Sequence, residues 1–468
     1  MNKRPLLFIS LLAGVMGIGP LAQAQTLEEA LAAAYLNNPT LKAERAALRA
    51  TDEQAPQASS DWRPSVEMTG IAGYSLNKSN TIRTTNGLQH RNPRSLAVTL
   101  SQSIYQGGQT WAAIREAENT IKAGRRQLAV VEQTVLLSAV TAFMDVYRDQ
   151  AVLELNINNE QVLTRQFEAT EDRFEVGEIT RTDVSQARAR LARATADRID
   201  AEGSLEITRA TFRNVVGYVP GKLDLPKPPE DLPVSKEEAI KVAAIANPNV
   251  IEAEFLEKAQ RDNVDQTKGE LLPSLDLSGS AKRAFDSFSE VSRFDSYEAK
   301  LILTVPIYQS GAVYSRLREA KQQVGEQRQL IDQKRRDAVE SATQAWETLQ
   351  TARARIDSFK TQIKSSEVAL EGVQMEAAVG SRTVLEILNA EQELLDAKAS
   401  MVRARRDEIV AIFNLKEATG KLTAKQLKLP VDFYDPTSHY QEVRGKWFGG
   451  SSTGGAESET KGDPRVED

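Results

Sequence analysis

VGEITRTDVSQA, residues 176–187, interrupts more than a hundred residues that contain no proline, between Pro93 and Pro220. The residues on both sides have a helical pattern, so a glycine followed by threonines indicates that one helix ends and another begins. VGSRTVLEILNA, residues 379–390, has the same layout. Two helical hairpins with similar turns are therefore expected in one chain.

Both turns contain residues suited to ending one helix and starting the next. Gly177 and Gly380 can adopt the left-handed conformation that ends a helix. A threonine followed three residues later by an acid, at 180–183 and 383–386, fits the capping-box spacing that starts a helix. The two acids could serve only as caps or could also make a functional contact, and the residues alone leave both interpretations open.

The hairpin belongs to a unit that occurs twice. TLEEALAAAYLNNP, residues 26–39, matches SKEEAIKVAAIANP, residues 235–248, at an offset of 209. SIYQGGQ, residues 103–109, matches PIYQSGA, residues 306–312, at an offset of 203. Six extra residues of the first copy therefore lie between Pro64 and Tyr105, and the chain is a duplication of one structural unit.

Each copy is expected to begin with two short helices, at about 26–37 and 40–60 in the first copy, followed by two segments with alternating apolar and polar residues. Such alternation indicates strands joined as a hairpin. The expected strands are at about 64–77, 94–106, 273–285 and 296–308. Their length suits a tilted strand of an outer-membrane barrel, and the edge of a soluble β-domain is the alternative.

A long helical pattern follows each pair of strands. Apolar or small residues recur every seven positions, which predicts a left-handed coiled coil. These positions are Ile114, Ile121, Leu128, Val135 and Ala142 in the first copy, and Leu317, Val324, Ile331, Ala338 and Ala345 in the second. A helix over residues 109–175 is on the order of 100 Å long, which a compact domain does not contain.

These patterns divide the chain into segments. The expected boundaries are a signal peptide at 1–24, a first repeat at 25–220 with a hairpin at about 107–215, a linker at 221–234, a second repeat at 235–430 with a hairpin at about 310–418, a segment at 431–448, and a disordered tail at 449–468. The signal peptide is predicted from Lys3 and Arg4, the apolar run that follows them, and Ala22-Gln23-Ala24.

Composition excludes several functions. The net charge of −6 argues against binding of nucleic acid. The chain has no cysteine, and His90 and His439 lack the spacing of metal ligands, so no metal site is expected. No phosphate-binding glycine loop or nucleophile elbow is present, and neither a catalytic residue nor a cofactor is expected.

Insertion into a membrane would have to use strands, because no run of about 18 consecutive apolar residues follows residue 24. Four strands cannot close a barrel, since outer-membrane barrels begin at about eight, and open edges in lipid leave polar groups unsatisfied. Several chains would therefore have to contribute to one barrel.

The chain resembles the TolC family of outer-membrane efflux proteins over about residues 25–430. The resemblance rests on the signal peptide, the duplicated unit of strands and helices, Leu272-Pro273-Ser274 at a strand start, the IYQGG and IYQSG junctions, and the two VG-x-x-T turns. The resemblance implies a mainly α fold with a membrane β-barrel. In that fold a homotrimer forms one 12-stranded barrel, continued by a periplasmic α-helical tunnel with an equatorial domain around it. The segment at 431–448 would belong to the equatorial domain.

The resemblance also implies a function. It predicts an outer-membrane channel with a large periplasmic portion, which carries drugs, toxic compounds or secreted proteins from an inner-membrane transporter and a periplasmic adaptor. Adaptor binding would open the helical tips like an iris. The alternative from another class is a pore-less periplasmic adaptor or a structural coiled-coil protein.

Specific residues match the positions with roles in the family. The resemblance places a periplasmic gate at Thr182, Asp183, Arg382, Glu386 and Asn389, with Arg382 tied to Thr182 and Asp183 across neighbouring coils. It places the adaptor-docking tips at Val176, Gly177, Val379 and Gly380. Asn389 stands where the family has an acid, which predicts a less negative entrance.

Overall fold

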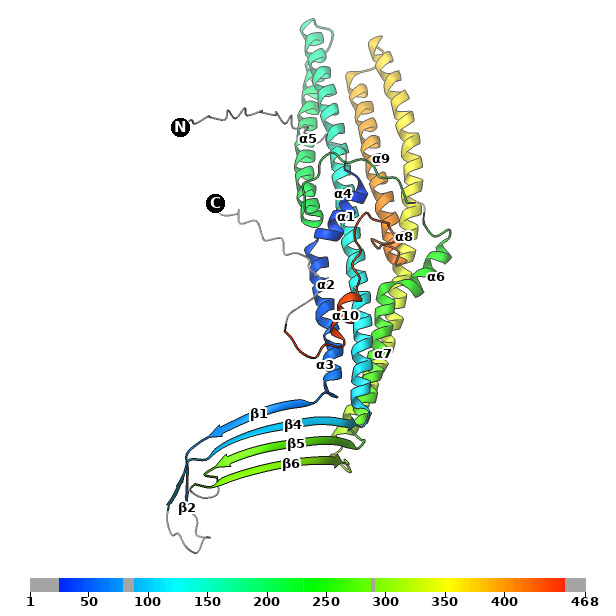
Figure 1. Cartoon of the computed structure of the whole chain (residues 1–468). Helices are drawn as coiled ribbons and strands as arrows, with labels where there is room; N and C mark the ends of the chain where they lie inside the picture. Colours follow the sequence, from blue (N-terminus) through cyan, green and yellow to red (C-terminus); the bar gives the residue numbers. More distant parts are fainter. Residues whose placement is uncertain (1–24, 79–87, 230, 288–290, 451–468) are drawn as a thin grey trace, which may run out of the picture. The chain divides into compact units, whose positions relative to one another are not determined.

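A computed structural model describes residues 25–78, 88–229, 231–287 and 291–450 (Figure 1). The expected signal peptide and all but the first two residues of the expected C-terminal tail lie outside these ranges. The chain divides into two compact units, which are described separately. One contains the described parts of 1–33, 139–228 and 356–406, and the other those of 34–138, 229–355 and 407–468.

The described residues are mainly helical and repeat one order of elements. The helices are α1 (Leu27–Asn37), α2 (Pro39–Asp52), α3 (Gln54–Ser60), α4 (Gln109–Glu175), α5 (Arg181–Val216), α6 (Lys236–Ala246), α7 (Pro248–Gly269), α8 (Ala312–Ala378), α9 (Val384–Ala418) and α10 (Ser438–Val443). The strands are β1 (Ser65–Ala72), β2 (Ser75–Lys78), β3 (Leu88–Arg91), β4 (Arg94–Gln106), β5 (Ser274–Phe285) and β6 (Arg293–Thr304). Helices α4 and α8 have 67 residues each, and both of their ends are related by the offset of 203.

Four strands form one antiparallel sheet in the order β1-β4-β5-β6 (Figure 1). Each repeat contributes one hairpin, and the two repeats meet where β4 pairs with β5. Strands β2 and β3 form a separate hairpin in the first copy, in the region that holds its six extra residues.

The first strand is shorter than the predicted 64–77, because β1 ends at Ala72 and β2 belongs to another sheet. Gly73 donates its N–H to the carbonyl oxygen of Pro93 at 3.0 Å. Proline has no N–H with which to continue the antiparallel ladder. The pairing of β1 with β4 therefore stops at this point.

The fourth strand is shifted from the predicted 296–308 to Arg293–Thr304. It ends before Pro306, which cannot donate to a neighbouring strand. It begins early where the Asp295 carboxylate accepts from Arg283 at 2.8 Å and from Arg293 at 2.8 Å. Ion pairs across and along the strands thus accompany the extra residues of β6.

The second short helix, predicted at 40–60, is two helices that meet at Glu53. Pro56 has no N–H to donate to the carbonyl of Asp52, so the helical hydrogen bonding is broken there. The second copy has Asp265 at the equivalent position, and α7 runs without a break for 22 residues.

The heptad positions predicted from the sequence are largely buried. Ile121, Leu128, Val135 and Ala142 on α4 have at most 6% of their surface exposed. In the first unit, α5 folds back on α4, with the rings of Phe143 and Phe212 6.5 Å apart. The expected seam is therefore a packing surface.

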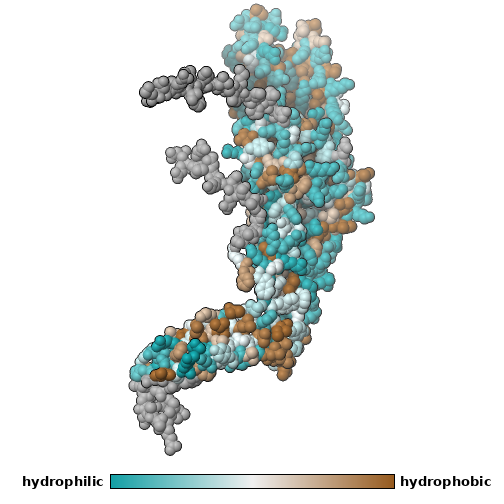
Figure 2. Space-filling view, in the orientation of Figure 1, coloured by the Kyte–Doolittle hydropathy of each residue, from teal (hydrophilic) through white to brown (hydrophobic). Residues whose placement is uncertain are grey.

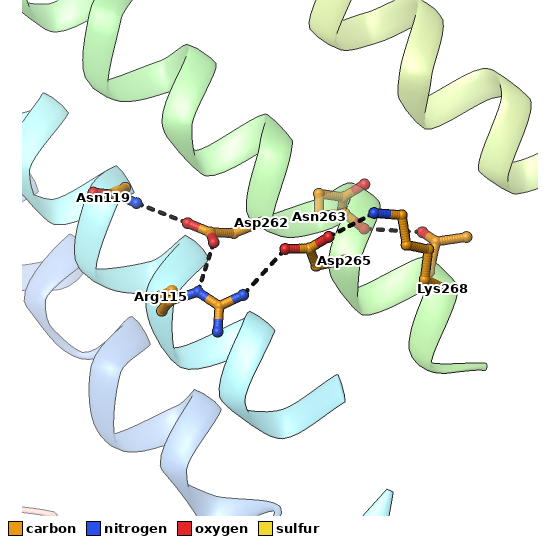
Figure 3. A network of polar contacts seen from close by, with 7 residues as sticks. Arg115, Asn119, Asp262, Asn263, Asp265 and Lys268 are labelled. Atoms are coloured by element: carbon orange, nitrogen blue, oxygen red, sulfur yellow. Dashed lines mark hydrogen bonds and ion pairs between the residues drawn. The ribbon is translucent and has the colours of Figure 1, made fainter. Parts of the chain in front are cut away.

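In the second unit, polar contacts also join the two repeats (Figure 3). The guanidinium of Arg115 on α4 donates to Asp262 at 2.7 Å and to Asp265 at 3.3 Å, both on α7. The amide of Asn119 donates to the other oxygen of Asp262 at 2.8 Å. This network fixes the start of α4 against the last turns of α7.

Within the described residues, one helix could cross a membrane by length and composition. An 18-residue window of α4 has a mean hydropathy of 1.4, and half of the window is buried within the chain. The sequence does not predict such a helix, because α4 contains no run of 18 consecutive apolar residues. A helix in the core of a protein passes the same test, so the finding assigns no membrane role to α4.

Candidate functional site

The first hairpin turn joins α4 to α5 through Gly177, whose φ of 79° lies in the left-handed region. Its N–H donates to the carbonyl of Phe174 at 2.9 Å, and the N–H of Glu178 donates to the carbonyl of Arg173 at 2.9 Å. Carbonyl groups at the end of a helix lack partners within the helix, and these bonds satisfy two of them. The predicted left-handed glycine is therefore present.

Helix α5 begins with the predicted capping box. The Thr180 hydroxyl accepts from the N–H of Asp183 at 3.3 Å, and an Asp183 carboxylate oxygen accepts from the N–H of Thr180 at 3.0 Å. The same oxygen accepts from the Thr180 hydroxyl at 2.7 Å. The Thr180 hydroxyl oxygen and one Asp183 carboxylate oxygen are thus hydrogen-bonded within the turn. Thr182, between these two residues, is exposed on α5.

The second turn repeats this geometry. Gly380 also has a φ of 79°, and the N–H of Ser381 donates to the carbonyl of Glu376 at 3.0 Å. A Glu386 carboxylate oxygen accepts from the N–H of Thr383 at 2.8 Å and from its hydroxyl at 3.1 Å. The two turns therefore share the left-handed glycine and the threonine cap, with aspartate as the capping acid in the first turn and glutamate in the second.

Arg382 distinguishes the second turn from the first. Its Nε donates to Glu376 at 2.7 Å and its Nη1 donates to Glu386 at 2.7 Å. These bonds raise the pKa of Arg382, so the guanidinium stays charged. The pKa of Glu386 is lowered from its ordinary value of 4.5, first by the N–H of Thr383 and then by Arg382. All three ion-pairing side chains are between 38% and 52% exposed to solvent.

The predicted tie between Arg382 and Asp183 is not formed among the described residues of this single chain. Arg382 bonds to two glutamates of its own turn, and Asp183 bonds to Thr180. The resemblance implies a tie between neighbouring coils, so the tie stays a prediction for an assembly. Arg382 uses Nε and Nη1 for its glutamates, so forming the tie requires it to exchange a partner or to donate from other N–H groups of the guanidinium.

A polar contact and an apolar cluster join the two hairpins near their turns. Arg190 on α5 donates to the Asn389 side-chain oxygen on α9 at 2.8 Å. Four buried residues from both hairpins pack together: Leu163, Ala194, Val384 and Leu388. The structure thus brings Asn389 and both capping segments to one end of the first unit.

The tips themselves carry exposed apolar side chains. Val176 is 73% exposed and Val379 is 81% exposed. Neither glycine next to them has an atom within 4 Å of the place where a Cβ would lie. Each turn therefore presents a valine and an open backbone to the solvent.

Glu376 is the contact residue that sequence reasoning missed. It lies six residues before Arg382, on the other side of the turn, so the i, i+3 and i, i+4 rules for helices do not pair them. The first turn holds a similar pair, in which Arg173 bonds to Glu178 at 3.0 Å, with the charges in the opposite order along the chain. Opposite charges placed across a glycine turn are the signal that identifies both pairs.

The sheet has one apolar and one polar face, which is the second feature of functional interest. On one face, Val66 lies opposite Leu100, Met68 opposite Val98, and Leu277 opposite Leu301. On the other face, the cross-strand neighbours are Glu67 and Thr99, Ser278 and Lys300, and Ser280 and Glu298. Figure 2 shows apolar side chains gathered along this sheet. The apolar side chains are largely exposed in the single chain, as for Val66 (69%) and Met68 (65%).

In the part of the chain that the structure describes, no group of three or more His, Cys, Asp or Glu side chains could hold a metal ion. Both histidines make other contacts. The His90 ring is hydrogen-bonded to the Tyr74 hydroxyl, and His439 bonds to Asp52 at 3.3 Å.

Both repeats of the chain are similar to known outer membrane proteins. The family model described as "Outer membrane efflux protein" matches residues 30–218 and 239–421, one match for each repeat. The outer membrane efflux protein BepC of Brucella suis biovar 1 (strain 1330) is 34% identical over 441 residues, covering 94% of this chain and 95% of BepC. The outer membrane protein TolC of Escherichia coli (strain K12) is 26% identical over 426 residues, covering 88% of this chain and 85% of TolC.

A solved structure has the same fold. The crystal structure of the Campylobacter jejuni CmeC outer membrane channel superposes with a TM-score of 0.77, at 16% sequence identity, over 90% of this chain and 89% of that chain. The duplicated unit of strand pair and long helical hairpin is therefore the fold of a known class of channels.

Proposed function

The chain belongs to the outer membrane efflux protein family, and from this we propose that three copies form the exit duct of a tripartite export system. The family consists of outer membrane channels, so the protein is an outer membrane efflux channel and not an enzyme. This excludes the alternative of a pore-less adaptor or structural coiled coil.

The observation that carries the proposal is the sheet, which is apolar on one face and polar on the other. Strands β1 and β6 each pair on one side only within the described residues. An unpaired edge in lipid leaves backbone N–H and C=O groups unsatisfied, at a cost of several kcal/mol per group. Three chains with four strands each close a 12-stranded barrel, with the apolar face toward lipid and the polar face toward the lumen.

The gate is proposed at the hairpin turns, where Thr182, Asp183, Arg382, Glu386 and Asn389 would line the periplasmic entrance. In the closed assembly, Arg382 would leave Glu376 or Glu386 to bond to Asp183 of a neighbouring coil. Exposed ion pairs contribute about 0–1 kcal/mol each. A few such ties hold a closed state weakly enough for a protein partner to release it.

The partners are proposed to be a periplasmic adaptor and an inner-membrane transporter. The adaptor would contact Val176, Gly177, Val379 and Gly380, because these residues form the exposed ends of the turns and the valines offer apolar surface. Its binding would separate the turns and open the tunnel. For the cargo we favour compounds removed by efflux, because BepC is named as an efflux protein, with a secreted protein as the second option.

Conductance in planar bilayers tests the gate. The purified protein is expected to show a small conductance and Arg382→Ala a severalfold larger one, because the variant loses the tie between coils. Arg173→Ala is the matched control, since it removes an exposed ion pair of the same kind from the first turn. Equal conductance of Arg382→Ala and Arg173→Ala would contradict the gate, and the absence of any conductance would contradict the channel assembly.

A further inference from the structure

The chain continues beyond the residues that match the family model, which end at residue 421. Residues 430–448, here called the C-terminal strap, contain α10 and run back along α2 and α3 (Figure 1). The N–H of Tyr434 donates to the Tyr35 hydroxyl at 3.1 Å, and the Arg45 guanidinium lies over the rings of Tyr35 and Tyr434 at 4.6 and 5.1 Å. The strap is therefore held in a defined position.

Further contacts fix the strap along its length. His439 bonds to the buried carboxylate of Asp52 at 3.3 Å. The Arg444 guanidinium bonds to Glu118 on α4 at 3.3 Å, and Val443 is only 2% exposed. These contacts hold the strap against α2 and α4 as far as Arg444.

The strap ends at the base of the sheet. Arg63, two residues before β1, donates to the carbonyl of Lys446 at 2.7 Å, and its guanidinium lies 4.9 Å from the centre of the Trp447 ring. Next to Arg63, the ring of Trp62 lies edge-on to that of Trp111 at 4.2 Å. Three of the four tryptophans of the chain thus gather where the helices meet the sheet.

These aromatic side chains are exposed although they are held in place. Trp447 is 57% exposed, Phe448 is 87% exposed and Trp111 is 59% exposed. A cluster of large apolar side chains on the surface indicates an interaction site. Lipid is the occupant that fits, because the cluster is continuous along the chain with the exposed apolar face of β1, which starts at Val66.

The chemistry of the cluster also suits a lipid surface. Tryptophan concentrates at the boundary between lipid headgroups and hydrocarbon, where its ring is buried and its N–H stays hydrated. A guanidinium stacked on that ring can bond to a lipid phosphate. We propose that Trp447 and Phe448 at the end of the strap, together with Trp111, anchor the protein in the headgroup layer of a phospholipid membrane, outside the sheet.

This inference rests on the proposed function, because it requires the sheet to lie in the membrane. The chain has no cysteine, so a single introduced cysteine can be labelled with an environment-sensitive fluorophore. Gly450→Cys reports on the strap end without altering Trp447, and no atom lies within 4 Å of its new Cβ. Met68→Cys reports on the apolar sheet face, and Lys425→Cys reports on an exposed site before the strap.

The labelled full-length proteins are placed in phosphatidylcholine vesicles that contain lipid with a nitroxide quencher near the headgroup. Quenching at residue 450 is expected to exceed that at residue 425 by about threefold, because interfacial side chains lie within the boundary layer. Adding Trp447→Ser and Phe448→Ser to Gly450→Cys is expected to reduce the quenching to the level of residue 425.

The outcomes separate the two proposals. Quenching at residue 68 with none at residue 450 overturns the anchor and leaves the barrel intact. Quenching at residue 450 that survives the double serine substitution also overturns the anchor. Absence of quenching at both residues 68 and 450 overturns the proposed membrane sheet and the anchor with it.

Discussion

At the scale of single residues, the two turns show how one backbone geometry is built twice and used differently. Gly177 and Gly380 share a φ of 79°, and each turn has a capping acid three residues after a threonine. Arg382 has no counterpart, because Ile179 occupies its position in the first turn. The two turns differ in a side chain and not in their backbone conformation, so substituting that side chain can test the difference.

Gly380→Ala is expected to destabilise the second turn by about 1–2 kcal/mol, the cost of a left-handed residue that has a Cβ. Hydrogen exchange of the amides at residues 376–386 should become faster. Gly372→Ala is the control, since Gly372 lies inside α8 with open space around it, and alanine there stabilises a helix by about 0.5–1 kcal/mol. Unchanged exchange in Gly380→Ala would show that the turn does not depend on glycine.

Glu386 is expected to make the gate sensitive to acid. The pKa of Glu386 in the folded turn is below the ordinary value of 4.5. Its ionised carboxylate therefore stabilises the second turn above pH 4.5, and this stabilisation is lost as pH falls through the lowered pKa. Protonated Glu386 no longer competes with Asp183 for Arg382, so the tie between coils should strengthen and conductance should decrease as pH falls from about 6 to about 3. Glu386→Gln should abolish this decrease, whereas Glu371→Gln, an exposed glutamate on α8, should retain it. A decrease of equal size in Glu386→Gln would assign the acid response to other groups.

At the scale of elements, helix and strand bounds follow from local rules except where prolines and ion pairs decide them. The long helices can be predicted almost to the residue, because the heptad pattern and the capping residues are local signals. Strands β1 and β6 are predicted less well, since their ends depend on which residue lies opposite Pro93 and on the ion pairs of Asp295. The docking of α4 on α7 through Arg115 has no signal in the sequence, because the partners are 147 and 150 residues apart.

Asp262→Ala is expected to weaken that docking by about 1–3 kcal/mol, because it removes a largely buried carboxylate that accepts from Arg115 and from Asn119. The midpoint of guanidinium unfolding, followed by circular dichroism of the helices, should decrease. Lys268→Ala is the matched control on α7, since its ion pair with Asp265 is half exposed and contributes about 0–1 kcal/mol. Equal midpoints of the two variants would mean that the network of Figure 3 does not support the packing.

At the scale of the whole molecule, one chain is incomplete as a membrane protein. Its sheet has an apolar face that is largely exposed and strands at both edges with a free side within the described residues. The sequence alone predicts that several chains are needed, because four strands are too few for a barrel. The proposed trimer makes β1 of one chain the neighbour of β6 of the next.

Cysteine pairs test this neighbourhood. Thr69→Cys on β1, combined with Ser296→Cys, Glu298→Cys or Lys300→Cys on the same face of β6, is expected to give disulfide-linked trimers on denaturing gels for at least one pair. Within one chain β1 and β6 are three strand spacings apart, about 14 Å, which exceeds the reach of a disulfide. Thr69→Cys with Tyr297→Cys is the control, because their side chains lie on opposite faces. Monomers for every pair would contradict the barrel.

The sequence by itself determined the duplicated unit, the two helical hairpins, their glycine turns and the alternating strands. These features depend on periodicity, capping and backbone preference, which act over a few residues. Only the tertiary structure decided that β4 pairs with β5, that Arg382 bonds to Glu376 and that Arg190 bonds to Asn389. The same holds for the bond from Arg63 to the carbonyl of Lys446 in the C-terminal strap. Each of these contacts joins elements or crosses a turn, and its stability comes from groups that the local sequence does not bring together.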